Sequence, residues 1–140
     1  REDGQARQWK RLRNVAMSVP VEVREFIGRA LREDIGHGDI TTEAVIPASA
    51  SVEAVVVAKE EAVVAGLGFA AEVFRQSDPA LRFTAVARDA ARVRKGTVLC
   101  RVRGGARGIL AAERVALNIL QRLSGIATAT ARLVSLVKGY

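Results

Sequence analysis

The sequence contains few of the residues on which disulfide-linked or metal-bound small domains depend. Its 140 residues include one cysteine, Cys100, and one histidine, His37. An internal disulfide and a multi-cysteine zinc site are therefore excluded, and we expect Cys100 to be a buried, reduced thiol. Because His37 has no partner ligands at a recognisable spacing, we predict no metal site within this chain.

Long apolar runs and aromatic side chains are scarce as well. No stretch approaches the ~20 uninterrupted apolar residues of a membrane-spanning helix, and the first residues do not resemble a secretory signal. We therefore expect a cytoplasmic protein with no membrane partner. Of six aromatic residues, only Phe83 lies in the basic stretch at 82–107. Since proteins grip single-stranded nucleic acids largely by stacking, we expect no nucleic-acid partner.

The sequence does contain enough apolar residues for one hydrophobic core, together with an uneven distribution of charge. Apolar residues make up 49% of the chain, which favours a folded domain, but about 250 residues are typical of a complete (β/α)₈ barrel. The net charge is +7. Residues 14–81 hold five basic and eleven acidic side chains, whereas residues 82–107 hold eight basic and one acidic. The basic stretch is therefore a candidate surface for a phosphate or carboxylate group.

The spacing of apolar residues predicts a mixture of helices and strands. Helices are expected at about 20–35, 69–77 and 109–123, the last followed by a bend at Ser124-Gly125 and a second helical stretch from Ile126. Strands are expected at 52–59 and 62–65, paired as a hairpin, and at 81–87 and 98–102. We divide the chain into a basic tail at 1–19, a domain at 20–108, and helices at 109–140.

A glycine-rich motif lies between a predicted strand and a predicted helix. Gly66, Gly68 and Ala71 match the G-x-G-x-x-A pattern of dinucleotide-binding turns, and Asp89 follows 23 positions after Gly66. The strand before Asp89 alternates polar and apolar residues, however, whereas a central strand of such a fold is apolar on both faces. We interpret the glycines as a tight entry into a packed helix.

The segment at 93–102 resembles a half-repeat of biotinyl and lipoyl carrier domains, which leaves a carrier module as an alternative. Such modules display a modifiable lysine at a hairpin tip, and Lys59 is the only candidate here. The Met-Lys-Met signature of those carriers is missing around Lys59. A plain hairpin of similar shape is therefore favoured.

Arg114 is the residue that we single out as a binding residue. It shares one face of the predicted helix at 109–123 with Asn118 and Gln121, in a narrow polar stripe on an otherwise apolar helix. A guanidinium in such surroundings needs an anion. The partner is either an acidic side chain of this fold, such as Glu113, or a carboxylate or phosphate in a cleft or a neighbouring subunit.

Two long motifs resemble those of nicotinate-nucleotide pyrophosphorylase (carboxylating), also called quinolinate phosphoribosyltransferase. Residues 31–42, LREDIGHGDITT, are similar to the L-x-E-D-x-G-x-G-D-[LI]-T-[ST] motif of that family. Residues 112–128 are similar to its A-E-R-x-x-L-N helix, which ends in S-G-I-A-T. Residues 59–66, KEEAVVAG, also fit the family pattern between these motifs.

This resemblance implies a fold and a reaction. The fold is an α+β domain, a sandwich with a mainly antiparallel four-stranded sheet, followed by the first helices of an α/β barrel that this chain truncates. The reaction, in NAD biosynthesis, joins quinolinate to the phosphoribosyl group of 5-phosphoribosyl-1-pyrophosphate and yields nicotinate mononucleotide, CO₂ and pyrophosphate. The resemblance further implies a homodimer, or an oligomer of dimers, in which Arg114 reaches the quinolinate carboxylates in the partner subunit's site.

The resemblance also implies that the other functional residues of the family, in a barrel that binds both substrates and Mg²⁺, would follow the motifs present here. We therefore expect this chain to contain no catalytic residue, to bind no metal by itself, and to be inactive alone. A paralogue acting on another substrate, either a molybdenum-transport-associated relative or a nicotinate-specific transferase, remains an alternative.

Overall fold

The computed structural model describes residues 19–36 and 40–137 of the chain. The expected tail at 1–19 therefore falls outside the described residues except for its last position, and so do His37 and Asp39. The elements, in chain order, are α2 (Val21–Ile35), α3 (Ile40–Val45), β1 (Ser51–Val57), β2 (Ala62–Val63), α4 (Leu67–Ser77), β3 (Arg82–Ala85), β4 (Arg92–Val93), β5 (Val98–Gly105) and α5 (Ala106–Val137). Within the described part, no helix is long and apolar enough to cross a membrane.

The strands form two antiparallel sheets. The larger sheet has the order β1-β5-β3, so β5 is its central strand, with Ala54 opposite Val102 and Phe83 opposite Val102 on the other side. The smaller sheet pairs β2 with β4. The α+β class and the antiparallel pairing are confirmed, but the strands are divided as three and two rather than gathered in one sheet of four.

The hairpin predicted for 52–59 and 62–65 is wrong. The first strand instead pairs over its whole length with β5, and the second, reduced to two residues, pairs with β4. The register shifts between Val56 and Val57, and the backbone N–H of Ala58 bonds the carbonyl of Thr97. Two apolar segments separated by a short polar turn satisfy the hairpin pattern, but the longer β5 offers β1 more backbone partners.

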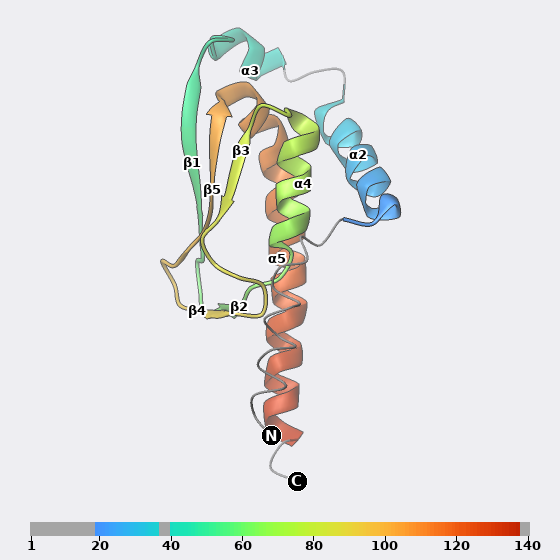
Figure 1. Ribbon diagram of the computed structural model, residues 1–140, viewed down its shortest axis with the longest axis vertical. Coiled ribbons are helices and arrows are strands. Elements are labelled where there is room, and N and C mark those ends of the chain that lie inside the picture. The colour runs from blue at the N-terminus through green and yellow to red at the C-terminus, as the bar shows by residue number, and fades with distance from the viewer. Residues whose placement is uncertain (1–18, 37–39, 138–140) are drawn as a thin grey trace, which may run out of the picture.

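The helices lie in two layers on one face of the larger sheet (Figure 1). Helices α4 and α5 pack side by side against the sheet, and α2 packs across the outer side of both. The core is formed where these layers meet, and its most completely buried large side chains are Ile27, Val64, Val73, Cys100 and Val102. Because α2 and α5 each turn one apolar stripe inward, their opposite faces are free to carry polar groups.

Helix α5 is continuous over 32 residues, so the predicted bend at Ser124-Gly125 is wrong. Ser124 turns its hydroxyl towards the backbone of Ala65, and Gly125 keeps a negative φ, so neither residue interrupts the helical hydrogen bonds. The domain boundary that we predict between residues 108 and 109 falls inside this helix, which begins at Ala106. The C-terminal end of α5 extends beyond the other described helices and strands (Figure 1).

The glycine-rich turn leads into α4, as the interpretation of that motif predicts. Gly66 has a φ of +100°, and a Cβ built there would lie 2.8 Å from Cδ1 of Leu123 in α5. Asp89 does lie beside this turn, where its carboxylate accepts a hydrogen bond of 3.1 Å from the backbone N–H of Leu67. Asp89 therefore caps the start of α4, which accounts for its spacing from Gly66.

Candidate functional site

Arg114 lies on the exposed side of α5. The opposite side of the helix is buried against the core, through Ala112, Val115, Ala116 and Leu120. The side chain of Arg114 is 78% exposed. The stripe that Arg114 forms with Asn118 and Gln121 therefore faces outward, away from the buried side of the helix.

One carboxylate of the fold approaches Arg114. Oδ1 of Asp34, in the last turn of α2, lies 3.5 Å from Nη1 of Arg114, and the Asp34 side chain is 25% exposed. This separation is longer than the 2.7–2.9 Å typical of a strong charge-assisted hydrogen bond. Asp34 thus orients the guanidinium electrostatically and leaves its fork available to another anion. The predicted alternative partner, Glu113, forms no ion pair with Arg114 in the described part of the chain.

A groove opens between α2 and α5, with Arg114 on its rim. Its volume is about 760 Å³, within the range of small-molecule sites. Both apolar and polar side chains line it. The lining residues of both kinds include Val23, Phe26, Ile27, Ile119, Asp34, Arg114, Asn118 and Arg122.

A second hollow adjoins the groove on the other side of Arg114. It has a volume of about 540 Å³, and its lining includes Asp34, Arg114, Asn118 and Gln121. Arg114 therefore stands on a ridge between two concave surfaces. The structure brings the three predicted stripe residues together there, in a place that a second molecule can reach.

The sequence analysis missed Asp34 and Arg122 as members of this site. Asp34 continues the spacing of Val23, Ile27 and Ala30 along the side of α2 that faces α5. That spacing is a signal that could have placed Asp34 beside α5 before the structure was known. Arg122 lies two turns beyond Arg114, outside the stripe that the i, i+4, i+7 rule selects.

Two further possibilities for chemistry are a reactive thiol at Cys100 and a metal site built from acidic side chains. Cys100 is completely buried, and burial raises the pKa of its thiol to about 11, so it stays protonated and unreactive near neutral pH. Among residues 19–36 and 40–137, no cluster of three or more His, Cys, Asp or Glu side chains could hold a metal ion. The described residues therefore do not fit a Mg²⁺ site.

The comparisons with known proteins decide the family. A family model described as "Quinolinate phosphoribosyl transferase, N-terminal domain" matches residues 39–124. The chain belongs to the quinolinate phosphoribosyltransferase family. The family match ends at Ser124, four residues after Leu120, the last buried residue of α5.

Relatives of this family share much of the chain. It is 46% identical over 110 residues to a chloroplastic nicotinate-nucleotide pyrophosphorylase (carboxylating) of Oryza sativa, covering 78% of this chain and 30% of the relative. It is 40% identical over 119 residues to the Mycobacterium leprae relative of that name, covering 83% of this chain and 42% of the relative. The chain thus spans less than half the length of these relatives.

Solved structures agree with this assignment. The nicotinate-nucleotide pyrophosphorylase of Francisella tularensis superposes with a TM-score of 0.80 at 35% identity, covering 88% of this chain and 44% of the other. NadC from Streptococcus pyogenes superposes equally well, covering 84% of this chain and 42% of its own. The expected α+β domain of this family is thereby confirmed.

Proposed function

We propose that this chain forms the N-terminal part of a quinolinate phosphoribosyltransferase. The enzyme transfers the phosphoribosyl group of 5-phosphoribosyl-1-pyrophosphate to quinolinate and releases CO₂ and pyrophosphate. The family match over residues 39–124, together with the position of Arg114 above an open groove, carries this proposal. The groups that act on the phosphoribosyl donor, and the Mg²⁺ that accompanies its pyrophosphate, belong to the barrel part of such an enzyme.

Arg114 supplies a quinolinate-binding group, and it does so for the site of a second subunit in a dimer. Quinolinate carries two carboxylates, and a guanidinium binds a carboxylate through two parallel hydrogen bonds. The side chain projects from the domain surface, and its one ion pair among the described residues is the 3.5 Å contact with Asp34, so it can extend into a neighbouring molecule. The exposed groove beside it is the surface that the partner would cover.

A chimeric enzyme tests the proposal. Residues 20–137 would replace the matching segment of the Mycobacterium leprae relative, and nicotinate mononucleotide formation would be measured. We expect the unsubstituted chimera to be active. In that background Arg114→Ala should raise the KM for quinolinate by about 10- to 100-fold, because a hydrogen-bonded charge contact is lost. Arg114→Lys should recover part of the loss, since it keeps the charge without the fork.

The matched control is Arg94→Ala, which removes an exposed arginine from the turn between β4 and β5. Its KM for quinolinate should equal that of the unsubstituted chimera. Circular dichroism of the 140-residue chain should be the same for both alanine variants. An unchanged KM in Arg114→Ala would refute the role of Arg114, and an inactive but folded, dimeric chimera would refute the assignment of this chain to the reaction.

A further inference from the structure

A third concave surface lies on the other side of α2, facing α4. It has a volume of about 590 Å³ and is lined mainly by arginines. The arginines of this basic pocket are Arg24, Arg29, Arg32 and Arg75; Val21, Glu25, Gly28 and Gln76 complete the lining. None of these residues lines the groove beside Arg114. Helix α2 therefore presents one face to the basic pocket and a different face to the groove beside Arg114.

The basic pocket holds more positive charge than the fold neutralises. Among the described residues that line it, four carry a guanidinium group and one, Glu25, carries a carboxylate. Among the described residues, Arg75 forms an ion pair with Glu72, and no ion pair is formed by Arg24, Arg29 or Arg32. Counting Glu25 and Glu72 against the four arginines leaves two unbalanced positive charges. An anion of charge about −2 would balance the pocket.

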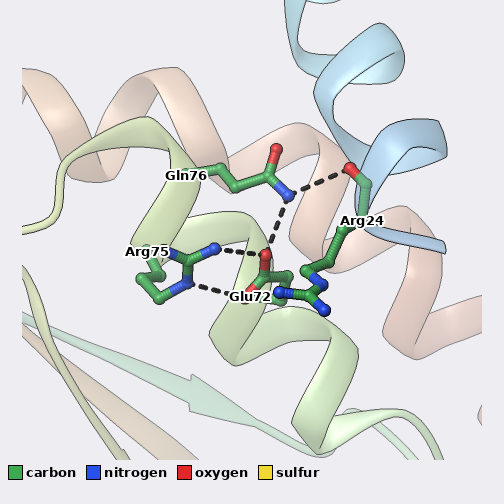
Figure 2. Close-up of polar contacts among 4 residues, drawn as sticks. All are labelled: Arg24, Glu72, Arg75 and Gln76. Carbon is green, nitrogen blue, oxygen red and sulfur yellow. Dashed lines mark hydrogen bonds and ion pairs between the residues drawn. The ribbon is translucent and has the colours of Figure 1, made fainter. Parts of the chain in front are cut away.

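The inner wall of the basic pocket is fixed by hydrogen bonds (Figure 2). Glu72 is only 8% exposed and accepts bonds of 2.7 Å from Nε and 2.6 Å from Nη2 of Arg75. The bonds from Arg75, with smaller contributions from Gln76 and the nearby charge of Arg24, lower the pKa of Glu72. The carboxylate therefore stays ionised, and the guanidinium of Arg75 is held in one orientation before any ligand arrives.

Gln76 joins the two helices at the base of the basic pocket. Its Nε2 donates to the backbone carbonyl of Arg24 at 3.0 Å and to Oε1 of Glu72 at 2.9 Å. Gly28 leaves room for this amide: a Cβ there would lie 3.1 Å from Oε1 of Gln76 and 3.4 Å from Nη1 of Arg32. The missing side chain at 28 lets Arg32 fold back over the pocket beside Gln76.

We propose that the basic pocket between α2 and α4 binds a small phosphorylated anion. A phosphate group has the tetrahedral oxygens that several guanidinium groups from two helices can share, and its charge matches the unbalanced charge of the pocket. The ligand is either free phosphate or pyrophosphate, or a phosphate monoester on a small molecule. This inference does not rest on the proposed transferase activity.

Calorimetric titration of the 140-residue chain at constant ionic strength tests the proposal, with pyrophosphate and ribose 5-phosphate as separate ligands. We expect saturable one-site binding of at least one of them. Tighter pyrophosphate binding identifies an inorganic anion, and tighter ribose 5-phosphate binding identifies a monoester. Arg32→Gln should weaken the binding about tenfold, because one charge-assisted hydrogen bond is lost, and R29Q/R32Q should weaken it further.

Two further variants separate this pocket from the general positive charge of the chain. Arg94→Gln removes one exposed positive charge far along the sequence from α2 and should leave the dissociation constant unchanged. Gly28→Ala crowds Gln76 and Arg32 and should weaken binding several-fold. Because alanine favours a helix more than glycine does, the thermal unfolding temperature of this variant should be at least as high as that of the unsubstituted chain. Equal weakening by Arg94→Gln and Arg32→Gln, or no saturable binding of either ligand, would overturn the proposal.

Discussion

The first half of α5, up to Leu120, and its second half, from Ser124 to Val137, contain a similar share of apolar residues. The first half is packed in the core, whereas the second is largely exposed to solvent. In the half up to Leu120, apolar residues are buried against α2, α4 and the sheet. In the half from Ser124 to Val137 no residue is buried, and Ile126, Leu133 and Leu136 are 60%, 66% and 70% exposed. The spacing of apolar residues is therefore enough to form a helix. Burial of those residues additionally requires neighbouring helices or strands that pack against them.

Two side chains at the start of the exposed half are hydrogen-bonded to the segment around β2. Thr128 accepts a hydrogen bond of 2.9 Å from the backbone N–H of Val63, and Ser124 accepts one of 3.1 Å from that of Ala65. These two hydroxyls take the place of backbone partners that the two-residue strand β2 lacks. The start of the exposed half is thus held by polar contacts.

The largest expected effect compares one leucine in each half. Leu120→Ala removes a side chain that is 4% exposed and should lower the free energy of unfolding by about 2–5 kcal/mol. Leu133→Ala should change it by no more than about 0.5 kcal/mol, because Leu133 is largely in solvent. Urea unfolding followed by circular dichroism measures both. Equal losses would show that the exposed half also contributes to the core.

A glycine that contacts the end of the buried half gives the next largest effect. Gly66→Ala places a Cβ 2.8 Å from Leu123 at a φ of +100°, so we expect a loss of about 2 kcal/mol in unfolding free energy. Gly36→Ala is the control, since Gly36 also has a positive φ, of +55°, but no atom within 4 Å of its Cβ position. The control should lose less, about 1 kcal/mol. A larger loss in Gly36→Ala would show that backbone strain, rather than contact with α5, dominates.

The sequence predicts where helices and strands form better than it predicts which of them pair or pack together. The spacing of Val23, Ile27 and Leu31 predicts α2, which does end at Gly36, where φ is positive. The apolar segments at 52–59 and 62–65 are correctly expected to be extended, but their pairing with β5 and β4 depends on contacts about 30 to 50 residues away along the chain. Short-range patterns contain no information about such pairings.

For the candidate site as well, the sequence predicts what lies on one helix but not what two helices bring together. The stripe of Arg114, Asn118 and Gln121 is predicted because it lies on one helix, where spacing determines direction. The pairing of Arg114 with Asp34 is not predicted, because it depends on the angle at which α2 crosses α5. The basic pocket escapes the sequence analysis for the same reason: its arginines lie on two helices, and the charge of residues 14–81 is acidic in total.

Loss of the hydrogen bond between the exposed half of α5 and the segment after β2 should have a smaller effect. Ser124→Ala removes the acceptor for the N–H of Ala65 and should lower the unfolding free energy by about 1 kcal/mol. Ser135→Ala is the matched control, because the Ser135 hydroxyl donates only to Arg132 within the exposed half. Hydrogen exchange at Ala65 should accelerate in Ser124→Ala and stay unchanged in Ser135→Ala. Unaltered protection of Ala65 in both variants would mean that the hydroxyl does not hold β2.

The smallest effect has the opposite sign. Gly125 lies inside the continuous helix, has a negative φ, and has no atom within 4 Å of its Cβ position. Gly125→Ala should therefore stabilise the chain by up to about 1 kcal/mol, because alanine loses less conformational entropy in a helix. A rise in thermal unfolding temperature with increased helical ellipticity would support a straight α5. A fall would mean that the chain needs glycine there to bend, and that the exposed half moves relative to the buried one.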